Sequence, residues 1–113
     1  MRLLEIVTGD QTKADIAQRI RAFGDTILGK GVVACKDTAG FIANRLGVFW
    51  MTTAINAAFD QNIGVEDADA LLGKPIGVPK TGVFGLVDLV GLDLMPHLSK
   101  SLLENLPADD AYR

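Results

Sequence analysis

The sequence has one cysteine and one histidine among its 113 residues, and each scarcity excludes a kind of site. With Cys35 alone, the chain can form neither an internal disulfide nor a cysteine-rich zinc site. His97 is the one candidate for a histidine base or ligand within the chain. It has no Cys, Asp or Glu partner at metal-ligand spacing, so we predict no metal site and a surface or packing position for His97.

Positive charge and long apolar runs are also scarce. The formal net charge is −3, from 11 basic and 14 acidic residues, and nothing suggests the positive face of a nucleic-acid-binding protein. No uncharged apolar stretch approaches the ~20 residues that span a bilayer. The first apolar run contains Glu5 and lacks the features of a signal peptide. We expect a soluble, cytoplasmic protein with no nucleic-acid or membrane partner.

The composition that is present is that of a globular protein. Hydrophobic residues make up 49% and charged residues 22%, which favours a folded chain. The length allows one modest core and leaves no room for two ordinary domains. Glycine, with 12 residues, exceeds the typical ~7%. None of these glycines forms a G-x-G-x-x-G after a strand or a G-K-[ST] motif.

The first third of the chain predicts a β-strand, an α-helix and a second β-strand. Residues 3–8 carry apolar side chains on both alternating sets, typical of a parallel strand covered on both faces. Thr12 and Asp15 resemble a capping box, and a helix to about residue 27 follows. Residues 32–35 form the second strand. A sheet of only two strands leaves backbone N–H and C=O groups unpaired at both edges. The two strands therefore look like the end of a larger sheet.

From residue 38 onward the pattern is helical. Residues 41–59 are apolar almost all round, which predicts a central, buried helix, with Asp37 and Thr38 as plausible N-caps. Short helices are expected over 65–72 and 83–90, with a Gly- and Pro-containing loop over 73–80. Asp93 can cap a last helix that runs to about residue 106, followed by a frayed polar tail.

Two polar positions interrupt these apolar segments. Glu5 lies in the middle of the first strand, where an unpaired buried carboxylate would cost several kcal/mol. It is exposed to water, or it is buried and then either paired with a cation or a histidine or protonated. Asn44 and Arg45 lie early in the apolar helix. Asn44 either bonds the backbone of the preceding loop or faces a binding site at the start of the helix.

Three segments together resemble the L-3-hydroxyacyl-CoA dehydrogenase family. They are Leu4-Glu5-Ile6-Val7, Lys36-Asp37-Thr38-Ala39-Gly40-Phe41-Ile42-Ala43-Asn44-Arg45 and Asp88-Leu89-Val90-Gly91-Leu92-Asp93. The resemblance covers essentially the whole chain, and its Lys-Asp-Thr-x-Gly-Phe-x-x-Asn-Arg element is highly specific. Residues 77–84 look most like the large bacterial multifunctional fatty-acid oxidation enzymes. Ala39 stands where the family usually has proline.

The resemblance implies an enzyme that oxidises the 3-hydroxyl of an acyl-CoA with NAD, in fatty-acid β-oxidation. In the family, a histidine acts as general base and a glutamate orients it and stabilises its cation. By position, Glu5 matches this glutamate and Asn44 matches the asparagine that contacts the reacting group. These two residues are the predicted catalytic residues.

The same resemblance implies a fragment. The family's histidine lies in a His-Phe-Phe-Asn-Pro stretch about a dozen residues before the glutamate, and the NAD fingerprint is also upstream. We therefore expect residues 1–37 to be the terminal βαβ piece of the NAD-binding domain and 38–113 the helical C-terminal domain. The fold class would be mainly α: a βαβ remnant of a Rossmann domain, then a helical bundle of the 6-phosphogluconate-dehydrogenase C-terminal-domain type.

We expect this fragment to be inactive alone, to form homo-oligomers and to meet acyl-CoA substrate only in the full enzyme. An alternative is a free-standing helical module for dimerisation or acyl-CoA binding without catalysis. A related oxidoreductase acting on another substrate, such as a sugar acid, is a third reading.

Overall fold

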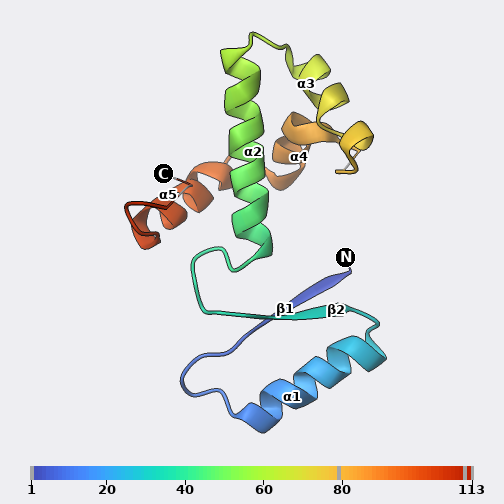
Figure 1. The fold of residues 1–113 in the computed structure, drawn as a ribbon, viewed down its shortest axis with the longest axis vertical. Coiled ribbons are helices and arrows are strands. Elements are labelled where there is room, and N and C mark those ends of the chain that lie inside the picture. Colours follow the sequence, from blue (N-terminus) through green and yellow to red (C-terminus); the bar gives the residue numbers. More distant parts are fainter. Residues whose placement is uncertain (1, 79, 111, 113) are drawn as a thin grey trace. The chain divides into compact units, whose positions relative to one another are not determined.

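A computed structural model describes residues 2–78, 80–110 and 112 (Figure 1). Helices dominate it, and the predicted mainly α fold class is confirmed. The elements, in chain order, are β1 (Leu3–Val7), α1 (Ala14–Ala22), the π-helical η1 (Phe23–Ile27), β2 (Gly31–Cys35), α2 (Ala43–Asp60), α3 (Val65–Leu71), the 3-10 helix η2 (Lys74–Ile76), α4 (Gly82–Val90) and α5 (Leu94–Asn105). The chain divides into two compact units, Met1–Asn44 and Arg45–Arg113.

The first unit is the predicted strand–helix–strand segment. β1 and β2 pair in parallel, with Glu5 opposite Val33 and Val7 opposite Cys35. Helix α1 and its extension η1 cover one face of this sheet (Figure 1). The contact is close at Gly24, where an added Cβ would lie 2.7 Å from Leu4 Cδ2. Glycine at this position therefore allows the helix to approach the strands.

Burial of the strands on both faces was wrong for the described residues. Leu3 is 38% exposed and Val33 39%, and Cys35 is the one strand residue that is buried. The capping box was also wrong, because helix α1 has no side-chain cap. The hydroxyl of Thr12 instead accepts a hydrogen bond from the Gly9 amide at 3.0 Å, which closes the turn after β1.

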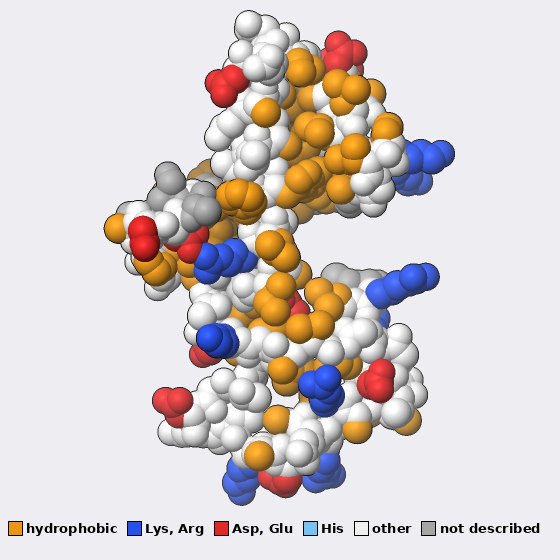
Figure 2. Space-filling model, viewed as in Figure 1, with side chains coloured by type: hydrophobic (Ala, Val, Ile, Leu, Met, Phe, Trp, Pro, Cys, Tyr) orange, Lys and Arg blue, Asp and Glu red, His pale blue; other side chains and the backbone are white. Residues whose placement is uncertain are grey.

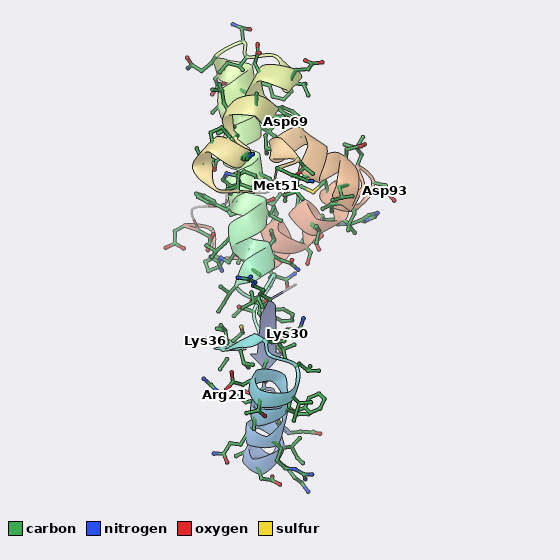
Figure 3. The ribbon with its side chains drawn as sticks, turned by 90° about the vertical axis from the view of Figure 1, so that its right-hand side faces the viewer. Arg21, Lys30, Lys36, Met51, Asp69 and Asp93 are labelled. Atoms are coloured by element: carbon green, nitrogen blue, oxygen red, sulfur yellow. The ribbon has the colours of Figure 1, made fainter. Side chains whose placement is uncertain are left out.

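In the second unit, α3 and α4 lie on one side of α2 and α5 lies on the other side (Figure 1). Figure 3 shows Met51 pointing from α2 towards α4. The buried apolar residues on these helices are Val48, Met51, Ala54, Ala58, Ala68, Val83, Val87 and Leu102. Those on α2 follow a spacing of three or four residues, so they form one stripe. Burial of α2 all round was therefore wrong: Leu46 is 64% exposed and Phe59 71%.

Asp69 of α3 fixes the beginning of α4. Its Oδ1 accepts the amide of Phe84 at 2.6 Å, and its Oδ2 accepts the amide of Gly85 at 2.9 Å. Figure 3 shows Asp69 where α3 approaches α4. Gly82 has φ +72°, and a Cβ there would lie 2.5 Å from Asp69. Any side chain at position 82 would therefore push the Asp69 carboxylate away from the amides that it caps.

The predicted frayed tail is instead anchored at Asp110, and Tyr112 after it also has a partner. Asp110 forms an ion pair with Arg45 in the first turn of α2, and its side chain is 12% exposed. The Tyr112 hydroxyl donates a hydrogen bond to Ser99 of α5 at 3.0 Å. The tail was predicted from its polar composition, which could not reveal that Arg45, 65 positions away, supplies its partner.

Within the described residues, no single helix is long and apolar enough to cross a membrane. Helices α4 and α5 meet that test of length and composition only as a pair, and they are bent by 93° at the break between them. No group of three or more His, Cys, Asp or Glu side chains that could hold a metal ion occurs in the same part of the chain.

Candidate active site

Glu5 lies at the centre of β1, on the face of the sheet opposite α1. Because side chains alternate along a strand, the register places Glu5, Val33 and Cys35 on this common face. Glu5 is partly buried there, so it is neither fully exposed to water nor fully buried.

One oxygen of the Glu5 carboxylate caps the beginning of α2. Glu5 Oε1 accepts hydrogen bonds from the amides of Ile42 and Ala43, each at 2.9 Å. The thiol of Cys35 lies 3.5 Å from the same oxygen. In the part of the chain that the structure describes, the predicted N-caps Asp37 and Thr38 give α2 no such bond, so this prediction was wrong. The cap comes from a strand 38 positions earlier in the chain.

These donors keep Glu5 ionised. The backbone hydrogen bond from Ala43 lowers the pKa of Glu5 most, with further lowering by the amide of Ile42 and the thiol of Cys35. Partial burial opposes them, but the net shift of the pKa is downward. Glu5 is therefore a carboxylate at neutral pH and can stabilise a cation beside it.

The backbone before α2 turns sharply enough to deliver these amides. Gly40 has φ +77° and Phe41 has φ +48°, both in the left-handed region. Helix α2 consequently begins at Ala43 rather than at Phe41, where the apolar pattern predicted it. This turn points the first amides of the helix at β1.

Asn44 follows directly and shares a pocket with Glu5. The pocket is shallow and open, of about 290 Å³, and is lined by Leu3, Leu4, Glu5, Phe41, Ala43 and Asn44. Asn44 is exposed, and among the described residues its side chain has no hydrogen-bond partner. The backbone-bonded alternative for Asn44 was therefore wrong. The site presents a carboxylate and an available amide side by side.

His97 belongs to the other compact unit. It is exposed in α5, where the sequence predicted a surface or packing position. Sequence reasoning missed Cys35 as a neighbour of Glu5, although the alternation of β2 in parallel register would have revealed it. The sequence gives no sign that the amides of Ile42 and Ala43 bind Glu5, because nearly every residue type supplies a backbone amide.

Comparison with known proteins identifies the family. Residues 40–113 match the model of the 3-hydroxyacyl-CoA dehydrogenase C-terminal domain. The chain belongs to the 3-hydroxyacyl-CoA dehydrogenase family. The resemblance inferred from its sequence motifs is confirmed.

Relatives extend the match over the βαβ segment. An uncharacterized protein of Rickettsia conorii is 45% identical over 112 residues, which are 99% of this chain and 70% of that protein. A Rickettsia felis protein named "Putative fatty acid oxidation complex trifunctional enzyme" is 42% identical over 99% of this chain and 16% of its own length. The crystal structure of M. tuberculosis FadB2 matches with a TM-score of 0.83 and 32% identity, over 99% of this chain and 38% of FadB2.

Proposed function

We propose that this chain supplies the glutamate and the asparagine of an NAD-dependent L-3-hydroxyacyl-CoA dehydrogenase site. The reaction is oxidation of 3-hydroxyacyl-CoA to 3-ketoacyl-CoA in fatty-acid β-oxidation. The observation that carries the proposal is the ionised carboxylate of Glu5, held by the amides of Ile42 and Ala43 beside Asn44.

Glu5 provides the charge that a catalytic base needs as it takes up a proton. A carboxylate beside an imidazole orients the ring and stabilises its cation, as in other base-and-orienter pairs. In the family this imidazole comes from upstream of the glutamate, and His97 does not match that position. Asn44 offers an amide that can donate to an oxygen of the reacting group or accept from its hydroxyl.

The residues of this chain do not fit the cofactor. The connection from β1 to α1 is residues 8–13, with one glycine and no G-x-G-x-x-G. We therefore place NAD binding on residues outside this chain and derive no step through it. The chain alone should accordingly show no measurable NAD binding and no turnover of acetoacetyl-CoA with NADH. Robust turnover by the purified chain would contradict this.

A chimera with FadB2 tests the catalytic roles directly. This chain would replace its structurally aligned region of FadB2, which is 38% of that protein. We expect acetoacetyl-CoA reduction by the chimera, and a loss of about 10²-fold or more in kcat with Glu5→Gln, the size typical of general acid–base contributions. Asn44→Ala should also lower kcat.

Two exposed residues give matched controls for the chimera. Glu66→Gln removes a carboxylate from the first turn of α3, and Asn56→Ala removes an amide from the exposed side of α2. Both should leave kcat within about twofold. A folded chimera in which Glu5→Gln is as active as the parent would refute the role of Glu5. A folded chimera that only binds acyl-CoA would favour the alternative of a binding module.

We also propose that the chain forms homo-oligomers in the cytoplasm. A groove of small and apolar residues lies between α2 and α3, lined by Ala54, Ala57, Leu71 and Leu72 among others. Figure 2 shows hydrophobic side chains gathered over this region. Apolar surface of this kind favours association. Light scattering should give a mass above 12.0 kDa that rises with concentration, and a strict monomer would contradict the proposal.

A further inference from the structure

The two oxygens of the Glu5 carboxylate have different surroundings. Oε1 has three donors within reach, namely the amides of Ile42 and Ala43 and the thiol of Cys35. No hydrogen bond reaches Oε2 from residues 2–78, 80–110 or 112. Oε1 is thus hydrogen-bonded within this chain, and Oε2 is available to a group outside it.

Such a division requires that the carboxylate does not rotate. The terminal torsion of glutamate is broad and roughly two-fold, so a side chain held from one direction alone can exchange its oxygens. The amides approach Oε1 from the beginning of α2, and Cys35 approaches it from the neighbouring strand β2. Donors on two separate elements restrict this rotation more than the amides alone.

The thiol is able to donate. Burial raises the pKa of the Cys35 thiol, and the hydrogen bond and the negative charge of Glu5 raise it further, so the thiol keeps its proton at neutral pH. Two acceptors compete for this proton: Glu5 Oε1 at 3.5 Å and the Val33 carbonyl at 3.8 Å. The carboxylate is closer and charged, and hydrogen bonds to charged acceptors are the stronger ones.

We propose that Cys35 is a positioning residue: together with the first amides of α2 it holds Oε1 of Glu5, and so presents Oε2 to the catalytic imidazole. The proposal rests on the proposed function for the identity of that imidazole. The arrangement of Cys35 and Glu5 itself can be tested without catalysis, in the 113-residue chain.

The test is an NMR titration of the Glu5 side-chain carboxyl carbon in the full chain. Cys35→Ala and Cys35→Val both remove the donor, one with a smaller and one with a larger side chain. Both should raise the pKa of Glu5, because a donor that stabilises the carboxylate is lost. Cys35→Ser keeps a donor and should restore the lower pKa. Val33→Ala, on the same face but without a polar group, should leave the pKa unchanged.

The outcomes separate the two hypotheses. A Glu5 pKa that is unchanged in folded Cys35→Ala or Cys35→Val overturns the role of Cys35. A pKa that rises equally in Val33→Ala also overturns it, because the effect would then be one of packing. If Cys35→Ala does not fold, Cys35→Val and Cys35→Ser still decide. If the pKa responds as expected but the FadB2 chimera is inactive, the proposed function fails while the positioning of Glu5 stands.

Discussion

The carboxylate of Glu5 and the amide of Ala43 are joined by a hydrogen bond of 2.9 Å that spans 38 positions of the chain. It links the middle of a strand to the first turn of the longest helix. A charge is thereby placed where the positive end of the helix dipole can stabilise it. The same bond satisfies an amide that has no acceptor inside the helix.

This bond should make the free energy of unfolding depend on pH in the acid range. The folded state lowers the pKa of Glu5 below its ordinary value of about 4.5, so the contribution is fully present above that value. It is lost as the pH falls from there through the lower pKa of the folded state. Urea unfolding from pH 3 to 7 should show this loss in the parent and a flatter profile in Glu5→Gln. Glu66→Gln should retain the profile of the parent, and identical profiles for all three would contradict the prediction.

Gly82→Ala should destabilise the second unit by about 2 kcal/mol or more. The left-handed φ of +72° disfavours any side chain, and the new Cβ would lie 2.5 Å from Asp69. Gly47→Ala is the matched control: this helix-interior position has nothing within 4 Å of the added Cβ, and the change should stabilise by roughly 0.5–1 kcal/mol. Thermal denaturation measures both. Equal effects of the two substitutions would argue against the role of the Gly82 conformation.

The Arg45–Asp110 ion pair should contribute more than an exposed pair does. Its side chains are 36% and 12% exposed, whereas those of Lys100 and Glu104 are 74% and 62% exposed. A double-mutant cycle with Arg45→Met and Asp110→Asn should give a coupling free energy of about 1 kcal/mol, at the upper end of measured surface pairs. The corresponding cycle for Lys100 and Glu104 should give about 0.3 kcal/mol, the value typical of helical i,i+4 pairs. A coupling no larger than in this control pair would contradict the expected anchoring of the tail.

Substitution by alanine at two neighbouring leucines of α5 should lower the free energy of unfolding by very different amounts. Leu102 is 3% exposed and Leu103 is 42% exposed. Leu102→Ala should destabilise by about 2–5 kcal/mol, because it removes transfer free energy and leaves a cavity. Leu103→Ala should cost about 1 kcal/mol or less, since much of its surface is already in water. Urea denaturation measures both, and similar losses would show that α5 packs through another face.

Local patterns identified much of this structure. The apolar runs at residues 3–8 and 32–35 predicted both strands, and the conflict of a charge inside the first run singled out Glu5. The polar position in an apolar helix and the family motif singled out Asn44 as a candidate, and its role stays a prediction. In each case the information that marks the position lies within a few residues of it.

What could not be predicted depends on partners that are distant in the chain. Asp69 gave no signal as the cap of α4, because its acceptor role requires amides 15 and 16 positions later. The sequence around Asp110 predicted a solvated tail, because its ion-pair partner Arg45 is distant in the chain. The extent of burial around α2 was overestimated for a similar reason: an apolar pattern records what a helix can bury, while the number of neighbours decides what it does bury.

The cap of α2 by Glu5 has a practical consequence for dissecting the protein. The family model begins at residue 40, and the compact helical unit begins at Arg45. A truncated helical half that starts at residue 40 would leave the carboxylate of β1 behind, and the amides of Ile42 and Ala43 would have only water as acceptor. One that starts at Arg45 would lose these two amides as well. The boundary that best preserves the helical half therefore lies before β1, in the segment that precedes the residues matched by the family model.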